Sequence, residues 1–466
     1  MKCIFCFLKD SHQAELRLLS QMQDERFENI LKKYKKLFIS GFIQSLGGEI
    51  CEHHKVVEEE KIRSFLRRIK KEDIEQFFDK IIDTVYLEWI KGNSNMAINS
   101  LRELIEGEKL NSGQFLTNVA DYLFFRGRKI SKSDILNTYD MFHIPFDKRY
   151  LIGNQRFSLN GHPLLYLGGS TYSVRQELDV DEEELEKLAF SSFYIKAESF
   201  EVIDLRNPFY AFYDHSNDNE EIEKINILPR INFKEIKRYL FFLILSSMCC
   251  FEKRVQQKLK AENSNIFFEE YVIPQTLTQV YKSLGKKGLL FPSTRIKENK
   301  EFDLINNLYR ANLVIFTDYN PKRHYDRKLY ESLIISNPIS IKNIEKFDIT
   351  KEHLLPLTEE IINIMLKIYK MADKREDSLV LIKQSNNLFT FHKKLLYFLC
   401  MKKNRNKGLE KIRNDVFSKN EIEKIEKMIE KREKENLKEI TNSEKIESFL
   451  IYNFLVKECF EILEEK

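Results

Sequence analysis

Residues 142–178 read FHIPFDKRYLIGNQRFSLNGHPLLYLGGSTYSVRQEL. Glycine and proline recur in the first part of this segment and favour turns there. The run HPLLYLG has the apolar and aromatic composition of a short strand. The closing residues, SVRQEL, predict a short helix. This change from turns to a strand and then to a helix predicts the start of a domain that mixes strands with helices.

The mixed pattern continues downstream and predicts one domain over residues 140–340. Short runs rich in β-branched and aromatic residues predict further strands: SFYIKAESFEVIDL, KGLLFPST and ANLVIFT. Helical pieces lie between them: VDEEELEKLAF, the apolar segment 234–251, and PQTLTQVYKSL, whose Pro274 suits a first helical turn. We therefore expect an α+β fold for this domain.

The flanking regions have helical periodicity. Before residue 140, apolar side chains recur at steps of three and four, as in Phe27, Ile30, Leu31 and Tyr34, which predicts an all-helical domain over residues 1–139. Residues 341–466 return to helical patterns with many charges and predict a helical C-terminal extension.

Composition excludes several classes of protein. Lys and Arg (76) nearly balance Asp and Glu (72) in 466 residues, so nothing in the charge indicates a nucleic-acid binder. The most apolar run, Tyr239–Phe251, is shorter than the roughly 20 residues that a membrane-spanning helix needs, so we expect a buried helix and no membrane partner. Seven cysteines without regular spacing predict no disulfide framework, and the N-terminus has no signal-peptide pattern. We expect a cytoplasmic protein.

Five side chains in the central domain suit chemistry on a dinucleotide. Arg149 and Arg156 precede a turn and a strand, where a guanidinium can bind a phosphate through two hydrogen bonds. Tyr166 offers a flat ring and a hydroxyl group. Glu177 offers a carboxylate that can stabilise an oxocarbenium-like centre, and Ser293 offers a small donor and acceptor. Each of these residues, taken singly, more often has a structural role than a functional one. It is their order along the chain that indicates a functional site.

That order resembles the RES domain family, which is named for its Arg, Glu and Ser. The matching residues are the run from Arg156 to Leu167, RFSLNGHPLLYL, then Glu177, and later Phe291-Pro292-Ser293. The resemblance covers about 200 residues and implies an ADP-ribosyltransferase-like fold that splits NAD⁺ and releases nicotinamide. It implies that Arg156, Tyr166 and Glu177 are catalytic.

The chain departs from the family pattern at three places. The Arg-Trp-Asn usual at the turn is Arg156-Phe157-Ser158 here. The family carries an arginine well before the turn, whereas the sequence just before the turn here reads Phe142-His143-Ile144-Pro145. Either Arg149 or His143 takes its substrate-binding role, with Ser293 completing the pocket. The long separation between Glu177 and Ser293 predicts a helical insertion near residues 218–262.

The resemblance implies a bacterial toxin or antiviral defence effector that acts as an NAD⁺ phosphorylase or glycohydrolase. It would need no bound cofactor, because NAD⁺ is the substrate, with inorganic phosphate as a candidate co-substrate. A regulatory partner such as an antitoxin, or self-assembly into a homo-oligomer, would restrain it. The alternatives are a mono-ADP-ribosyltransferase that modifies a macromolecule and a non-catalytic nucleotide-binding sensor or scaffold.

A separate cysteine pattern lies at the N-terminus. Cys3 and Cys6 form a Cys-x-x-Cys pair, and Cys51 and His53 follow, with His54 and His12 as further candidates. Tetrahedral zinc takes four such nitrogen and sulfur ligands, so a zinc site is one interpretation. Thiols that hold no metal are the other.

Overall fold

A computed structural model of the chain describes most of its first 341 residues. The described residues are 3–22, 26–48, 56, 58–120, 122–131, 136–197, 199–212, 231–254, 267–295, 310–341, 446 and 450. The predicted C-terminal extension therefore lies almost entirely outside them. The chain forms two compact units, each built from three separate segments. Unit 1 comprises residues 1–118, 143–166 and 200–327, and unit 2 comprises residues 119–142, 167–199 and 328–466.

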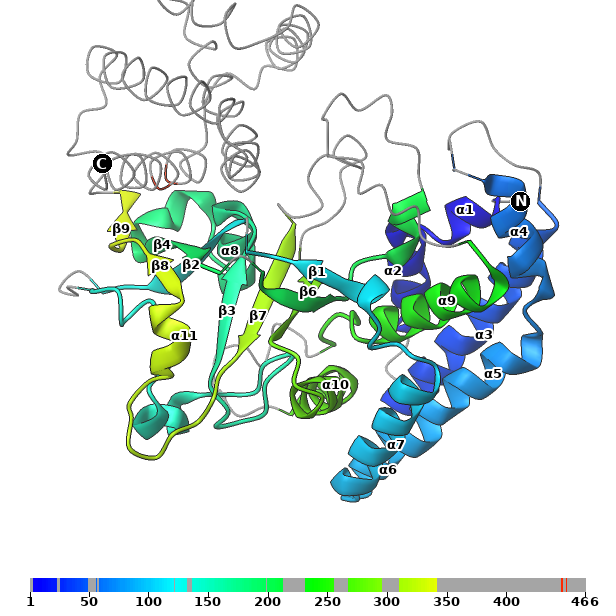
Figure 1. The fold of residues 1–466 in the computed structure, drawn as a ribbon, viewed down its shortest axis with the longest axis horizontal. Helices are drawn as coiled ribbons and strands as arrows, with labels where there is room; N and C mark the ends of the chain where they lie inside the picture. Colours follow the sequence, from blue (N-terminus) through cyan, green and yellow to red (C-terminus); the bar gives the residue numbers. More distant parts are fainter. Residues whose placement is uncertain are drawn as a thin grey trace, which may run out of the picture. The chain divides into compact units, whose positions relative to one another are not determined.

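Unit 1 contains most of the helices (Figure 1). Its α-helices are α1 (Ile4–Phe7), α2 (Asp10–Ser20), α3 (Phe27–Leu46), α4 (Glu59–Arg68), α5 (Lys71–Asp79), α6 (Leu87–Ile90), α7 (Ser94–Gly107), α9 (Phe233–Met248) and α10 (Val272–Ser283). A π-helical turn, η1 (Lys80–Tyr86), joins α5 to α6, and 3₁₀ turns are η2 (Gly113–Phe115), η3 (Phe146–Leu151), η5 (Pro208–Phe212) and η7 (Glu269–Tyr271).

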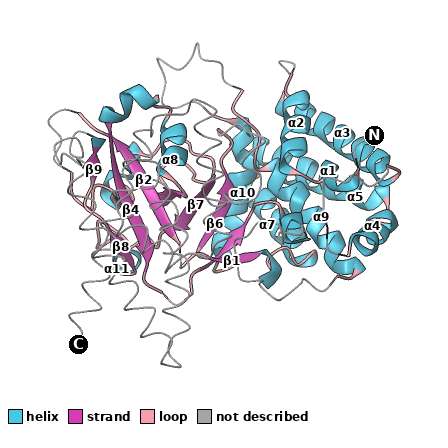
Figure 2. Ribbon diagram, turned by 90° about the horizontal axis from the view of Figure 1, so that it is seen from above, coloured by secondary structure: helices cyan, strands magenta, loops and turns pink. Residues whose placement is uncertain are grey.

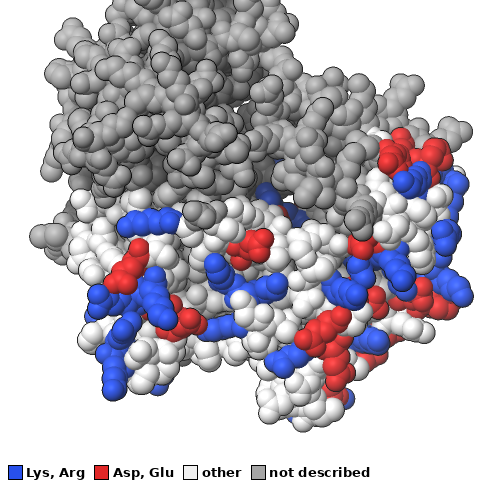
Figure 3. Space-filling view, in the orientation of Figure 1, with Lys and Arg blue, Asp and Glu red and all other residues white. Residues whose placement is uncertain are grey.

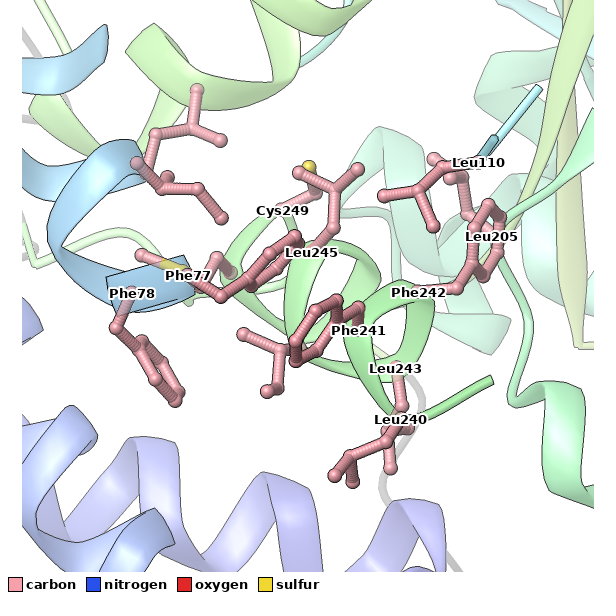
Figure 4. Packing of buried hydrophobic residues seen from close by; sticks show 14 of the residues in the cluster. Phe77, Phe78, Leu110, Leu205, Leu240, Phe241, Phe242, Leu243, Leu245 and Cys249 are labelled. Atoms are coloured by element: carbon pink, nitrogen blue, oxygen red, sulfur yellow. The ribbon is translucent and has the colours of Figure 1, made fainter. Parts of the chain in front are cut away.

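The apolar helix α9 forms the centre of unit 1. Its side chains from Tyr239 to Met248 are buried, and the Asn232 side chain caps its N-terminus by accepting a hydrogen bond from the Glu235 N–H group. Helix α9 packs against α4 and α5 (Figure 2). Stacked rings join α9 to its neighbours: Phe241 lies on Phe77 of α5 (4.3 Å between centroids) and Phe242 on Phe115 of η2 (4.0 Å). Figure 4 shows Phe77 and Phe241 among the buried hydrophobic side chains of this core.

This packing divides the chain differently from the predicted domains. The helices before residue 119 share one core with α9 and α10, which come from the range 140–340. The segment predicted as a helical insertion near 218–262 contains α9, which is core and not an added surface element. The prediction that residues 1–139 are all helical is also wrong at its end, because two strands, β1 (Leu116–Asn118) and β2 (Leu123–Lys129), lie there.

The strands of unit 1 follow one another in the order β1-β5-β6-β7-β3. They are β5 (Glu201–Asp204), β6 (Gly288–Pro292), β7 (Ala311–Phe316) and the start of β3 (Leu164–Gly168). Strand β5 runs antiparallel to β1 and parallel to β6, and β6 runs antiparallel to β7. The predictions of strands over 287–294 and 311–317 are confirmed. Strand β7 is buried along its whole length, as expected of an apolar run without alternation.

Unit 2 is built around β2 and β4 (Leu188–Ile195), which pair antiparallel over seven residues from Leu123↔Tyr194 to Lys129↔Leu188. Strand β2 also pairs with the end of β3 through Phe125↔Gly168. The remaining elements are α8 (Thr171–Leu178), η4 (Glu182–Lys187), α11 (Arg327–Glu331), β8 (Leu333–Ile335) and β9 (Ile339–Ser340). Both β8 and β9 pair with β4. The helix predicted over 180–190 is a 3₁₀ turn over Glu182–Lys187, and its last three residues are wrong, because β4 begins at Leu188.

The structure thus confirms a fold that mixes helices with a sheet. Among the described residues, no helix combines the length and the apolar character needed to cross a membrane. On the face drawn in Figure 3, basic and acidic side chains of the described residues are interspersed, with no broad field of one sign.

Candidate functional site

Arg156 lies at the C-terminal end of α9 in unit 1. One of its terminal nitrogens, Nη1, donates to the carbonyl oxygens of Cys249 and Phe251, each at 2.8 Å. The other, Nη2, donates to Oγ1 of Thr294 at 3.0 Å. Carbonyl groups at a helix C-terminus lack partners within the helix and carry partial negative charge, so a cation there is stabilising. Arg156 therefore ties the end of α9 to the residues after β6, and its guanidinium also lies 5.1 Å from the ring centre of Tyr271.

Tyr166 supports the turn that carries Arg156. Its hydroxyl oxygen accepts a hydrogen bond from the Phe157 N–H group at 3.2 Å. Burial raises the pKa of the Tyr166 hydroxyl well above its ordinary value, so the group stays protonated. The structure therefore brings Tyr166 and Arg156 together, with the tyrosine holding the backbone beside the arginine.

A third side chain, which the sequence did not single out, fixes the same turn. The amide nitrogen of Gln275 on α10 donates to Oδ1 of Asn154 (2.5 Å) and to the carbonyl oxygens of Gln155 (2.8 Å) and Ser158 (3.1 Å). Gln275 is 3% exposed. Because three acceptors converge on one buried amide, the turn over residues 154–158 is held in one conformation.

Ser293 and Arg149 occupy different surroundings. Ser293 follows β6; its N–H group donates to the Arg310 carbonyl at 2.9 Å, and its hydroxyl accepts from the Arg295 N–H group at 3.3 Å. Its neighbour Thr294 is the residue that reaches Arg156. Arg149 is exposed and lies 5.8 Å from the ring centre of Tyr319, on the surface of unit 1.

His143 is buried and holds a loop. Its Nε2 accepts a hydrogen bond from the Asp326 N–H group at 3.0 Å, and its Nδ1 is 2.8 Å from the Ile144 carbonyl oxygen. Since a carbonyl only accepts, Nδ1 carries the proton and the ring is neutral in this arrangement. With 1% of its surface exposed and both ring nitrogens used by backbone groups, His143 has the geometry of a loop-positioning residue.

Glu177 belongs to unit 2, on the last turn of α8. Ser170 caps the start of this helix by accepting a hydrogen bond from the Ser173 N–H group at 3.0 Å. In the middle of the helix, Val174 packs against two glycines: a Cβ atom added to Gly127 or to Gly168 would lie 2.7 Å from a Val174 methyl carbon. The helix can approach the strands this closely because those two positions have no side chain. Glu177 itself is half-buried.

Arg175 fixes the chain that leaves this helix. It is 8% exposed, donates from Nη1 to the Val180 carbonyl at 3.0 Å, and places Nε 3.1 Å from a carboxylate oxygen of Glu182. Asp179, with φ of 55°, ends the helix in a left-handed conformation. The helix that carries Glu177 is thus anchored at its start, at its middle and after its end.

Arg126 on β2 is a further candidate functional residue. The sequence did not single it out, because the region before residue 140 was predicted to be helical. It is half-buried and lies opposite Ser191 of β4 in the strand pair. The face it shares with Ser191 is opposite to the one covered by α8, since the neighbouring Gly127 faces Val174. The Ser191 hydroxyl is fully buried and has no hydrogen-bond partner within the described part of the chain. The pattern LFFRGRK, in which a cation follows three apolar residues directly, would have been the indication in the sequence.

Only half of the predicted zinc ligand set can be examined. Cys3 and Cys6 lie side by side in α1 and its cap, whereas Cys51, His53 and His54 are outside the described residues. His12 pairs with Glu15 at 2.9 Å. No three His, Cys, Asp or Glu side chains gather as a metal-binding group in the described ranges. Zinc remains a prediction.

One comparison with known proteins gives a match. The chain is 28% identical over 302 residues to a protein of Bacillus subtilis (strain 168) described as "Putative toxin YopC". No family model and no solved structure matches the chain. The match covers 63% of this chain and 62% of YopC, so the chain is similar to a protein named as a toxin over less than two thirds of the length of either.

Proposed function

We propose that this chain is a toxin that cleaves the bond between nicotinamide and ribose in NAD⁺. The similarity to YopC supports the coarser part of this proposal, a toxin. The order of Arg156, Tyr166 and Glu177, which resembles the RES family, supports the finer part. The mixed fold is compatible with both.

The observation that carries the proposal is the fixed position of Glu177. Helix α8, which carries Glu177, is anchored by the Ser170 cap at its start, by Val174 against two glycines, and by Arg175, which holds the chain after its end. A carboxylate carried by an anchored helix can stabilise positive charge that develops in a transition state. Loss of nicotinamide from NAD⁺ builds such a charge on the ribose ring, as in other cleavages of glycosidic bonds.

In the proposed reaction the bond between the ribose C1 and the nicotinamide nitrogen breaks, and its electron pair leaves with nicotinamide. Water or inorganic phosphate then adds to C1. Water loses a proton and gives ADP-ribose, while phosphate gives the phosphorylated sugar. Glu177 faces the developing cation.

The test measures NAD⁺ and nicotinamide by chromatography in cells induced for the wild type, for Glu177→Gln, and for Glu183→Gln as a matched control. Glu183 is an exposed glutamate in η4, close in sequence to Glu177. We expect the wild type and Glu183→Gln to deplete NAD⁺, and Glu177→Gln to be slower by about 10²–10³-fold. Equal depletion by all three variants would reject Glu177 as the catalytic carboxylate. Intact NAD⁺ with the soluble wild-type protein would reject NAD⁺ cleavage as the basis of toxicity.

A cell that makes such a toxin needs to restrain it, so the proposal includes a neutralising partner. Nicotinamide release alone does not identify the acceptor. Mass spectrometry of the products separates ADP-ribose, its phosphate ester and an ADP-ribosylated macromolecule. This measurement distinguishes the hydrolase, the phosphorylase and the transferase.

A further inference from the structure

Two cysteines at the start of unit 1 lie within reach of each other. Cys3 caps α1, and its sulfur is 3.4 Å from the sulfur of Cys6. Both are present as thiols. Cys3 is 3% exposed, whereas Cys6 is partly exposed to solvent. The two thiols therefore differ in access although their sulfur atoms are in contact.

Exposure to solvent assigns the two thiols different roles. The Cys3 S–H group points to the Cys6 sulfur, and the Cys3 sulfur accepts from the Cys6 N–H group at 3.4 Å. A small disulfide in solution reaches the more exposed sulfur first. Cys6 is thus the more accessible of the two sulfur atoms and the one that attacks first.

The surrounding packing holds the pair in place. The flanking residues Ile4, Phe5 and Phe7 are each 1% exposed, and the ring of Phe7 contacts that of Phe38 in α3 at 5.2 Å between centroids. The helical turn is closed by a hydrogen bond from the Phe7 N–H group to the Cys3 carbonyl. The sulfur atoms need only move from 3.4 Å to about 2 Å to form a bond, while this anchored backbone stays in place.

We propose that Cys3 and Cys6 form a redox-active dithiol that reacts with low-molecular-weight disulfides. The Cys6 thiolate attacks one sulfur of the small disulfide, which releases one thiol and leaves a mixed disulfide on Cys6. The Cys3 thiolate then attacks the Cys6 sulfur, which releases the second thiol and closes the Cys3–Cys6 disulfide. Two protein thiols are oxidised, and one small disulfide is reduced to two thiols. The proposal does not depend on the cleavage of NAD⁺.

The test uses the purified full chain in buffers of reduced and oxidised glutathione, followed by acid quenching, denaturation, alkylation and mass spectrometry. Trypsin releases the peptide CIFCFLK, residues 3–9, which holds both cysteines. In oxidised glutathione we expect this peptide to lose both alkylation sites and to become lighter by two hydrogens. Cys249 and Cys250 serve as internal controls, because they are buried and burial raises the pKa of both thiols. We expect both to remain alkylated.

Two variants test the assigned roles. Cys3→Ser should accumulate one glutathione on Cys6, because the resolving thiol is gone, while Cys6→Ser should stay unmodified at Cys3. Adducts on Cys3 instead of Cys6 would overturn the order of attack. Two alkylated cysteines in fully oxidised glutathione would overturn the dithiol proposal. One zinc ion per chain that protects both cysteines from oxidation would also overturn the dithiol proposal, and it would support the zinc interpretation.

Discussion

The Val174 side chain occupies the space that a side chain on Gly168 would need: an added Cβ atom would be 2.7 Å from Val174 Cγ2. Gly168 ends β3 and Val174 lies in the middle of α8, so this contact sets how closely the helix approaches the strand. The position of Glu177, one turn further along the helix, depends on it.

Gly168→Ala should displace α8 and destabilise the protein by about 1–3 kcal/mol, the usual cost of overpacking. Urea denaturation measures this change. Gly107→Ala at the end of α7 is the control, because a Cβ atom there has no neighbour within 4 Å. Its stability should stay the same or rise by up to about 1 kcal/mol, since alanine favours a helix more than glycine does. Adding Val174→Ala to Gly168→Ala removes the clashing methyl groups. The double variant should lose less stability than the two single losses combined, and strict additivity would contradict the contact.

Arg156→Lys should destabilise the protein by about 2–3 kcal/mol although it keeps the charge. A lysine cannot reach both the Cys249 and Phe251 carbonyls and Thr294, and hydrogen bonds to charged groups are each worth about 1.5–3 kcal/mol. Arg149→Lys is the matched control, since Arg149 is exposed, and should change the free energy of unfolding by no more than about 0.5 kcal/mol. An Arg156→Lys protein of unchanged stability but raised KM for NAD⁺ would instead show a substrate-binding role.

Asp10 should make stability depend on pH. Burial raises its pKa from 3.8 to about 6, although Arg17 and hydrogen bonds with Tyr210 and Asn207 oppose this shift. Between these values the folded chain holds a proton that the unfolded chain has released. The stabilisation from this group is therefore complete below pH of about 4 and is lost as the pH rises to about 6. Asp10→Asn should flatten this part of the stability profile in urea denaturation, whereas Asp83→Asn, which removes an exposed carboxylate, should preserve it. A profile that is identical for the wild type and Asp10→Asn would contradict the shift.

The range 140–340 should not fold when expressed alone. It contains α9, which packs on α4 and α5 and stacks Phe242 on Phe115. Separation from residues 1–139 would expose the rings of Phe241 and Phe242 to water. We expect insoluble fragment, and soluble protein when residues 1–139 are co-expressed as a second chain. A soluble, cooperatively unfolding fragment would show that the shared core is dispensable. Within the full chain, Phe241→Ala should cost about 3–5 kcal/mol.

The sequence predicted the elements whose patterns are local. Strands β6 and β7 and helix α9 are apolar runs bounded by polar or turn residues, and α8 follows a serine that caps it. Each of these features lies within a few residues of the chain. The alternation of predicted strands and helices along the chain indicated the mixed fold class.

The rest depended on contacts between distant residues. Nothing local indicates that Phe241 stacks on Phe77, or that the Gln275 amide reaches the turn at 154–158, because these pairs lie more than 100 residues apart. Strand β2 escaped prediction because the second half of LFFRGRK is charged and exposed. The acidic run VDEEELEKLAF was predicted as one helix, whereas pairing with β2 draws its last residues into a strand.

The division of both units among three segments has a consequence for synthesis on the ribosome. Unit 1 needs residues as late as Arg327. Until at least residue 248 has emerged from the ribosome, its first 118 residues expose the surface that α9 covers in the folded protein. Strand β3 contributes its first residues to unit 1 and its last to unit 2, so neither unit is complete before most of the chain is made. A truncated nascent chain therefore carries a helical half without its central helix. Premature termination should therefore give a chain that cannot complete either unit and is removed by cellular quality control.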